Sequence, residues 1–362
     1  MKILIGGGGT GGHIYPALAL ARFAQAEDNA ADILFVGTEK GLENKIVPSA
    51  GFQLKTIPAR GFQRNFKQIV SVLLDLLGGL REAGRIIDKF KPNVVLGTGG
   101  YVAAPLVISG LIKRYPVVIH EQNALPGLVN RRLSPFVKRV CLSFEETKHR
   151  LPRRSKISFT GNPRASEVSA LTREEGCRYF GLKPEQKNIL IYGGSRGALR
   201  LNEVITEYIK EGFLPEGVNL IYITGDIYYG DVMKELENTN EKIKIFSYLA
   251  EMPEALAAAD LAVTRSGATT LAELTALGVP AILVPSPNVV ANHQYYNARL
   301  LSDAGAAVLI EEKDFNRLAL RQEIDRLLTE PKYLADMKEK SRSLGVTDAA
   351  ERLYRCLQEV AS

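Results

Sequence analysis

Two glycine-rich segments of the chain could each hold a phosphate group. The first is GGGGTGGH at 6–13 and the second is GGSRGA at 193–198. Glycine allows tight turns and lets backbone N–H groups approach a phosphate, and the positive end of the helix expected after each segment adds to the attraction. Ser195 adds a hydroxyl group to the second segment and Arg196 adds a positive charge. Two such segments indicate two phosphate-bearing ligands, or a donor and an acceptor with one phosphate group each.

The first segment also fits the GxGxxG pattern of dinucleotide sites, through Gly7, Gly9 and Gly12. A dinucleotide site needs an acidic residue at the end of the second strand. That strand ends at Gly37, and Glu39 follows one position too late. The pattern therefore disfavours a nicotinamide cofactor and favours another phosphate-bearing ligand, with a purely structural turn as the alternative.

His13 stands at the end of the first segment, where a helix is expected to begin. An imidazole titrates near neutral pH, which suits a general base. We predict that His13 is the general base, and a structural or helix-capping role is the alternative.

The segment RSGATTLAE at 265–273 follows an apolar run and opens a helix. Backbone amides of Ala268, Thr269 and Thr270 would lie at the N-terminus of that helix. Glu273 lies about one turn further on, where a carboxylate can accept both hydroxyls of a ribose. The alternative is an acid placed favourably in the helix dipole, which is worth ~0.3–1 kcal/mol.

Polar amides follow two further apolar runs. Gln294 belongs to NHQYYNA at 292–298, and Asn123 belongs to HEQNALPG at 120–127. Open α/β sheets bind ligands beyond the carboxyl ends of their strands, and amides offer paired donor and acceptor atoms. We expect both residues to contact sugar hydroxyls, and His293 either to do the same or to face solvent.

The elements that must position these residues repeat a strand, glycine loop and helix. Short apolar runs at 2–5, 31–37, 92–101 and 115–123 begin the first series, and a second series starts near Asn188. Such runs, separated by helical segments, predict parallel sheets with helices on both faces. A chain of 362 residues exceeds one ordinary core, so we expect two domains with a boundary in 151–164.

Composition narrows the class of protein. With 46 basic and 40 acidic residues the net charge is +6, which suits anionic ligands or an anionic membrane surface but not a nucleic-acid binder. The three cysteines form no CxxC pattern, so neither a disulfide framework nor a zinc site is indicated and a reducing cytoplasm is expected. The start does not read as a signal peptide, and the longest uncharged apolar stretch, 102–112, is shorter than the ~20 residues of a spanning helix.

Any membrane contact is therefore expected to be peripheral. Apolar residues from Phe66 to Leu80 recur at helical spacing with basic residues around them. Such a stripe suits a membrane interface, although a helix packed on a sheet looks similar. The stripe is Phe66, Ile69, Val70, Leu73, Leu77 and Leu80, and the basic residues are Arg64, Lys67, Arg81 and Arg85.

Taken together, the ordered motifs resemble those of the MurG family of peptidoglycan glycosyltransferases. They are GGGGTGGH, GTGGYVAAP, HEQNALPGLVN, GNPR, GGSRGA, RSGATTLAE and NHQYYNA, and they span 1–299. The resemblance implies a GT-B fold, which is α/β with two Rossmann-like domains whose parallel sheets flank a central cleft. It implies an N-terminal domain at 1–163, a C-terminal domain at 164–340, and a final helical segment at 341–362 that returns to the N-terminal domain.

The resemblance also implies the reaction and its residues. GlcNAc would move from UDP-GlcNAc to the muramyl C4 hydroxyl of lipid I, with inversion, to give the β-1,4 linkage of lipid II at the cytoplasmic face of the cell membrane. The acceptor side would include Gly9, His13 and Tyr101, and membrane contact would involve Phe66, Ile69, Leu73 and Leu77. The matching donor positions are Thr10, Gly11, Gly12, Asn123, Arg164, Ser195, Leu249, Ala268, Thr269, Thr270, Glu273 and Gln294.

Some positions depart from the family. Arg196 and His293 stand where some relatives carry other residues. The family often has Ile at the position of Leu249, and a backbone contact to uracil would survive that change. No acidic pair suggests a metal site, and no cofactor is expected. Three other classes remain open: a UDP-GlcNAc 2-epimerase, a GT-B transferase with another acceptor, and a non-catalytic sugar-nucleotide-binding protein. Cell-wall synthesis or division proteins are further expected partners.

Overall fold

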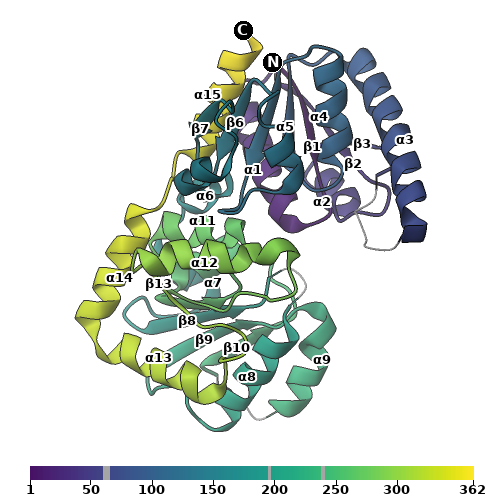
Figure 1. The fold of residues 1–362 in the computed structure, drawn as a ribbon. Coiled ribbons are helices and arrows are strands. Elements are labelled where there is room, and N and C mark those ends of the chain that lie inside the picture. Colours follow the sequence, from purple (N-terminus) through teal and green to yellow (C-terminus); the bar gives the residue numbers. More distant parts are fainter. Residues whose placement is uncertain (60–65, 195–196, 238–240) are drawn as a thin grey trace. The chain divides into compact units, whose positions relative to one another are not determined.

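The computed structural model of the chain describes residues 1–59, 66–194, 197–237 and 241–362, with the backbone alone for 66–73. The chain forms two compact units (Figure 1). The first unit is Met1–Arg164 with Asp348–Ser362, and the second unit is Ala165–Thr347. Each unit is a parallel sheet covered by helices, which confirms the predicted α/β class with two parallel sheets.

The sheet of the first unit has the strand order β3-β2-β1-β4-β5-β6-β7. The order reverses between β1 and β4, and open α/β sheets bind ligands at such a switch point. The strands are β1 (Lys2–Gly7), β2 (Asp32–Gly37), β3 (Gln53–Thr56), β4 (Val94–Gly99), β5 (Val117–Glu121), β6 (Arg139–Leu142) and β7 (Ile157–Phe159). The helices are α1 (Gly11–Glu27), α2 (Glu43–Ser49), α3 (Phe66–Phe90), α4 (Ala103–Ile112), α5 (Leu128–Leu133), η1 (Glu145–Arg150) and α15 (Ala349–Ala361).

Two apolar cores enclose this sheet. Ile3 and Ile5 of β1 pack on one face with α1 and α15, whereas Leu4 packs on the other face with α3 and α4. A strand buried on both faces needs apolar residues at successive positions, which explains the unbroken run in 3–5. In the first core Cys356 of α15 lies 3.4 Å from Cys141 of β6, sulfur to sulfur, and both thiols are free.

The sheet of the second unit has the order β10-β9-β8-β11-β12-β13, with its reversal between β8 and β11. The strands are β8 (Lys187–Tyr192), β9 (Val218–Ile223), β10 (Ile243–Phe246), β11 (Leu261–Thr264), β12 (Ala281–Leu283) and β13 (Ala307–Leu309). The helices are α7 (Arg173–Phe180), α8 (Leu199–Lys210), α9 (Asp226–Glu235), α10 (Met252–Ala258), α11 (Ala268–Leu277), η2 (Val290–Asn292), α12 (His293–Asp303), α13 (Arg317–Thr329) and α14 (Pro331–Ser343), and α6 (Arg164–Val168) begins where the first unit ends.

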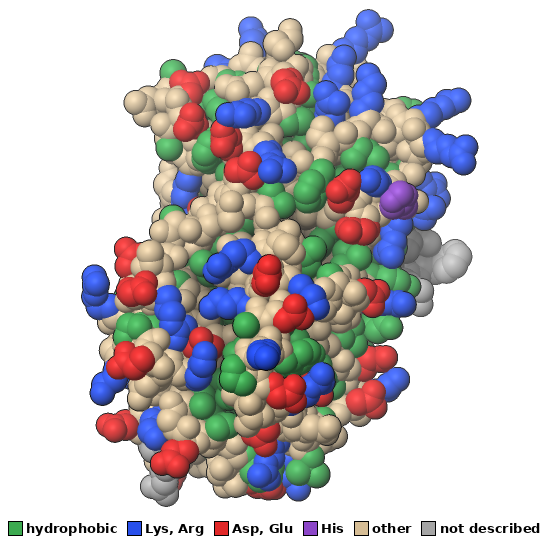
Figure 2. All heavy atoms as spheres, turned by 90° about the vertical axis from the view of Figure 1, so that its left-hand side faces the viewer, with side chains coloured by type: hydrophobic (Ala, Val, Ile, Leu, Met, Phe, Trp, Pro, Cys, Tyr) green, Lys and Arg blue, Asp and Glu red, His purple; other side chains and the backbone are tan. Residues whose placement is uncertain are grey.

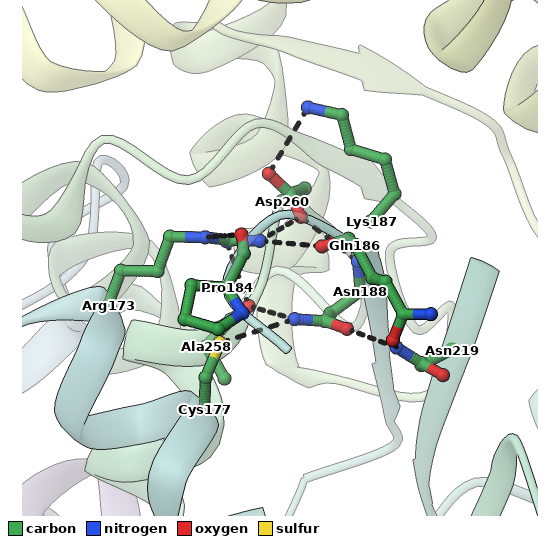
Figure 3. Close-up of polar contacts among 9 residues, drawn as sticks. All are labelled: Arg173, Cys177, Pro184, Gln186, Lys187, Asn188, Asn219, Ala258 and Asp260. Carbon is green, nitrogen blue, oxygen red and sulfur yellow. Dashed lines mark hydrogen bonds and ion pairs between the residues drawn. The ribbon is translucent and has the colours of Figure 1, made fainter. Parts of the chain in front are cut away.

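A polar cluster at the amino ends of β8 and β11 ties α7 to this sheet (Figure 3). Asp260 accepts hydrogen bonds from Arg173 at 2.8 Å and from the backbone N–H of Asn188 at 2.9 Å. Asn188 in turn donates to the carbonyl of Ala258 at 3.0 Å and accepts from Asn219 at 2.9 Å. Because parallel sheets bind ligands at the carboxyl ends of their strands, this cluster is structural.

Helix α3 carries the last part of the predicted membrane stripe. Of the described stripe residues, Leu77 is 56% exposed and Leu80 is half-buried. Leu74, which the predicted stripe did not include, is 63% exposed, and the buried face of α3 holds Ala83 and Ile87. The side chains of Phe66, Ile69, Val70 and Leu73 lie outside the described residues. Within the described part of the chain, no helix combines the length and the apolar character needed to cross a bilayer.

Candidate active site

In the first unit, the glycine loop joins the carboxyl end of β1 to the N-terminus of α1. Gly9 adopts a φ of +83°, a conformation that favours glycine. Thr10 is extended and precedes the first helical residue, Gly11, so Gly11 and Gly12 lie at the positive end of α1. Tyr101 flanks the loop, since a Cβ on Gly9 would lie 3.1 Å from its ring.

His13 in the first turn of α1 is held on β4 by two contacts with Thr98. Its Nδ1 lies 3.0 Å from the carbonyl oxygen of Thr98, and the Thr98 hydroxyl donates to the His13 carbonyl at 3.0 Å. A carbonyl oxygen can only accept, so Nδ1 carries the proton and Nε2 is the basic nitrogen of the neutral ring. Gly99, with a φ of +103°, makes room for the ring, because a Cβ there would lie 2.6 Å from Nδ1.

A buried polar chain continues behind His13. The Gln122 amide donates to the same Thr98 carbonyl at 2.6 Å and lies 3.2 Å from Nδ1 of His120. Nε2 of His120 lies 2.9 Å from the carbonyl of Gly161. Within the motif HEQN, the sequence analysis predicted a role for Asn123 alone and missed Gln122 and His120. The available signal was that these polar residues come directly after a buried apolar run.

His120 is fully buried, and this burial lowers its pKa to about 4, against the opposing effect of the Gly161 carbonyl. Below pH 6.5 the ring of His120 is therefore protonated in the unfolded chain, whereas in the folded chain it stays neutral until the pH approaches 4. We expect the free energy of unfolding to be highest above pH 6.5 and to fall by about 3 kcal/mol from this group as the pH drops toward 4. Urea unfolding across that range measures the effect.

The variant His120→Gln lacks this titration and serves as the control. Its unfolding free energy should depend less steeply on pH between pH 6.5 and 4. The difference in slope corresponds to up to about one fewer proton taken up on unfolding. Equal slopes for the two chains would contradict a buried, neutral His120.

Two more predicted site residues belong to the first unit. Asn123 donates from its backbone N–H and its amide to Glu121 at 2.9 and 3.3 Å, so the carboxylate fixes its side chain. The Arg164 guanidinium lies over the ring of Tyr15, 5.6 Å from the centroid.

In the second unit, α11 begins at Ala268 directly after Gly267, which places Thr269 and Thr270 in its first turn as predicted. Glu273 follows in the next turn and is 8% exposed. Burial raises the pKa of the neighbouring Tyr192 phenol, and the Glu273 charge adds to that rise. Glu273 thus lies close to the end of β8, where the second glycine loop begins.

Gln294 is fixed against the same helix start. Ser266 donates to the Gln294 carbonyl at 2.8 Å, and the side-chain oxygen of Gln294 accepts from the backbone N–H of Ser286 at 2.8 Å. Its NH₂ group is therefore the end suited to a sugar hydroxyl. The preceding residues Ala291 and Asn292 both have a positive φ, a strained conformation that is concentrated at functional sites.

The structure thus groups the predicted residues within each unit. Gly9 to His13 and Tyr101 gather in the first unit, and Ala268 to Glu273 with Gln294 gather in the second. Leu249 is buried in the segment after β10. Asn123 and Gln294, both expected on sugar hydroxyls, belong to different units. Ser195 and Arg196 lie outside the described residues. Among those that are described, no group of three His, Cys, Asp or Glu is placed to hold a metal ion.

Comparisons with known proteins agree along the whole chain. Residues 3–142 match the glycosyltransferase family 28 N-terminal domain, and residues 188–353 match its C-terminal domain. A UDP-N-acetylglucosamine--N-acetylmuramyl-(pentapeptide) pyrophosphoryl-undecaprenol N-acetylglucosamine transferase of Acetivibrio thermocellus is 44% identical, covering 99% of this chain and 98% of the relative.

Solved structures show the same fold. MurG of Acinetobacter baumannii is 28% identical, with a TM-score of 0.78 and 99% of each chain covered. A UDP-GlcNAc 2-epimerase from Neisseria meningitidis, bound to UDP-GlcNAc, has a TM-score of 0.68 over 99% of this chain and 100% of its own. At 14% identity the epimerase shares the fold alone.

Proposed function

We propose that this chain, which belongs to glycosyltransferase family 28, transfers GlcNAc from UDP-GlcNAc to lipid I. Within that family it belongs to the UDP-N-acetylglucosamine--N-acetylmuramyl-(pentapeptide) pyrophosphoryl-undecaprenol N-acetylglucosamine transferases. The product is lipid II, an intermediate of peptidoglycan synthesis. The observation that carries this proposal is 44% identity over 99% of the chain. The chain is accordingly an enzyme, a UDP-GlcNAc-dependent hexosyltransferase.

The donor binds mainly to the second unit. Glu273 accepts the two ribose hydroxyls, and the NH₂ group of Gln294 donates to a hydroxyl of the sugar. The first turn of α11 brings backbone amides of Ala268 to Thr270 to the nucleotide, and the segment at Leu249 contacts uracil through its backbone. Fixed N–H dipoles at the N-termini of α8 and α11 stabilise the negative charge that develops on the leaving UDP.

The first unit holds the acceptor and the base. Nε2 of His13 takes the proton from the muramyl C4 hydroxyl as that oxygen attacks C1 of GlcNAc. The C1–oxygen bond to UDP breaks in the same step, so the α-linked donor gives a β-1,4 product. Thr98 supports this role because its carbonyl fixes the tautomer that leaves Nε2 basic.

One experiment tests the reaction against its alternatives. The chain is incubated with labelled UDP-GlcNAc, with and without lipid I, and UDP and labelled lipid are followed. We expect UDP and labelled lipid II only when lipid I is present. Conversion of UDP-GlcNAc without an acceptor would indicate an epimerase. Transfer only to another glycolipid would indicate a different transferase, and binding without UDP release a non-catalytic protein.

The chain is proposed to act at the cytoplasmic face of the cell membrane as a peripheral protein. Leu74, Leu77 and, one turn on, the exposed Arg81 share a face of α3, an arrangement that suits an anionic membrane surface. Around α5, Leu128 and Phe136 are 70% and 71% exposed. Lys and Arg side chains project along the first unit at the top of Figure 2. Exposed basic residues of α5 are Arg131 and Arg132, and further exposed basic residues later in the same unit are Lys138, Arg153, Arg154 and Lys156.

Leu74→Glu with Leu77→Glu is expected to weaken binding to phosphatidylglycerol-containing vesicles at least about tenfold. Two apolar contacts are lost and two negative charges are added toward an anionic surface. Sedimentation with vesicles measures the binding, and turnover of a soluble acceptor analogue should stay unchanged.

The matched control places the same change elsewhere. Leu318→Glu with Leu344→Glu alters two exposed leucines of the second unit, which are 57% and 41% exposed. This control should retain vesicle binding. Equal losses in the two double variants would show that overall charge, and not the α3 face, governs the binding.

A further inference from the structure

A buried carboxylate lies under the first glycine loop. Glu43, the first residue of α2, is fully buried. Its Oε2 accepts the backbone N–H of Gly9 at 3.0 Å, and its Oε1 accepts the backbone N–H and the hydroxyl of Thr38 at 2.9 and 2.8 Å. The carboxylate therefore joins the loop after β1 to the turn after β2.

Glycines lie so close to this carboxylate that a Cβ at their positions would press on it. A Cβ on Gly8 would lie 2.6 Å from the Glu43 carboxyl, and one on Gly41 would lie 2.1 Å from its oxygens. At Gly37 a Cβ would lie 2.4 Å from Cγ of Glu43. Part of the glycine content of the loop thus makes room for Glu43 rather than for a ligand.

A second segment packs closely on the loop. A Cβ on Gly100, the residue after β4, would lie 2.3 Å from the carbonyl oxygen of Gly8. Gly8 therefore contacts this segment as well as Glu43. Four residues after Gly9 comes His13, whose ring rests on Thr98 of the same β4 end.

We propose that Glu43 is a positioning residue that fixes the glycine loop, and through it His13 and the N-terminal amides of α1, for the acceptor's reaction. Glu43 does not touch the substrate. Because the Gly9 N–H donates to Glu43, that N–H holds the loop and is not available to an acceptor group. This inference rests on the proposed function and adds a residue that the sequence motifs do not contain.

Glu43→Gln tests the proposal with almost no change in shape. An amide has one acceptor oxygen and one NH₂ group, so it cannot accept from both Gly9 and Thr38. We expect kcat to fall about 30-fold, the size of one lost charge-assisted hydrogen bond, while KM for UDP-GlcNAc changes less than about threefold. Hydrogen exchange in a peptide containing Gly9 should become faster.

Thr38→Val is the matched control. It removes one hydrogen bond to the same carboxylate and leaves the bond to Gly9 in place. It should lower the melting temperature about as much as Glu43→Gln but keep kcat within about threefold and leave exchange near Gly9 unchanged. Equal kcat and equal exchange in the two variants would overturn the positioning role.

Gly8→Ala approaches the same contact from the loop, because its methyl group would press on the Glu43 carboxyl. It should reproduce the loss of kcat, and it keeps the proposal testable if Glu43→Gln does not fold. Normal kcat in Gly8→Ala together with unchanged exchange near Gly9 would also overturn the proposal. The exchange readout needs no substrate, so it stands even if the wild-type chain fails to make lipid II, an outcome that would reject the proposed function alone.

Discussion

His13→Ala is expected to lower kcat by about 10²–10⁴-fold while leaving the affinity for UDP-GlcNAc nearly unchanged. That range is typical of the loss of a general base. Glu273 and Gln294, for which we propose donor contacts, belong to the second unit, whereas His13 belongs to the first, so the substitution should change donor binding little. Single-turnover transfer from labelled UDP-GlcNAc to lipid I measures the rate, and competition by UDP measures the affinity.

The physical reason lies in the tautomer that Thr98 imposes. With Nδ1 donating to the Thr98 carbonyl, the lone pair of the neutral ring is on Nε2, where it can take the proton from the acceptor hydroxyl. A protonated ring has no such lone pair. Transfer by the unaltered chain therefore requires the neutral ring, whereas the residual rate of His13→Ala should not depend on it.

His13→Asn separates chemistry from packing. The amide NH₂ of Asn can still donate to the Thr98 carbonyl, but Asn offers no basic nitrogen. The loss of kcat should thus be about as large as in His13→Ala, with a smaller loss of thermal stability. Recovery of kcat in His13→Asn would show that His13 holds the loop and that another group takes the proton.

The fold was predictable because its signals are local. The runs at 3–5 and 189–192 are apolar at successive positions, and both belong to strands buried on two faces. Glycine segments after such runs mark strand-to-helix turns: the sequence predicts a helix that begins at His13, and α1 begins at Gly11, two residues earlier. The placement of His13 in the first turn of α1 follows from the same local pattern.

The supports of the site were not predictable, since they join residues that are distant in sequence. Glu43 reaches Gly9 across 34 positions, and His13 reaches Thr98 across 85. The sequence analysis considered Glu39, which follows β2 one position too late for a dinucleotide site. The acidic residue that contacts the glycine loop is instead Glu43, which accepts hydrogen bonds from backbone N–H groups. Likewise, the sequence predicts that the Gln294 amide offers both a donor and an acceptor to a ligand. In the structure its side-chain oxygen already accepts a hydrogen bond from the backbone N–H of Ser286.

Glu273→Ala is expected to raise KM for UDP-GlcNAc about 10²-fold with a much smaller effect on kcat. Removing a carboxylate that accepts hydrogen bonds from two ribose hydroxyls costs charge-assisted bonds worth roughly 1.5–3 kcal/mol each. Water that enters the site replaces part of this energy. If Glu273 served only the helix dipole of α11, its removal would cost ~0.3–1 kcal/mol of stability and leave KM alone. Initial rates at varied UDP-GlcNAc, with thermal unfolding of the same samples, distinguish the two roles.

A donor that lacks the ribose 2′-hydroxyl gives the sharper test, because it removes the partner instead of the residue. The unaltered chain should bind this analogue at least about tenfold more weakly than UDP-GlcNAc. Glu273→Ala should bind the two donors almost equally, since the group that distinguishes them is gone, and Glu273→Gln should fall between. If loss of the 2′-hydroxyl weakened binding by the same factor in all three chains, it would be independent of the substitution at Glu273. The ribose contact would then have to come from another residue.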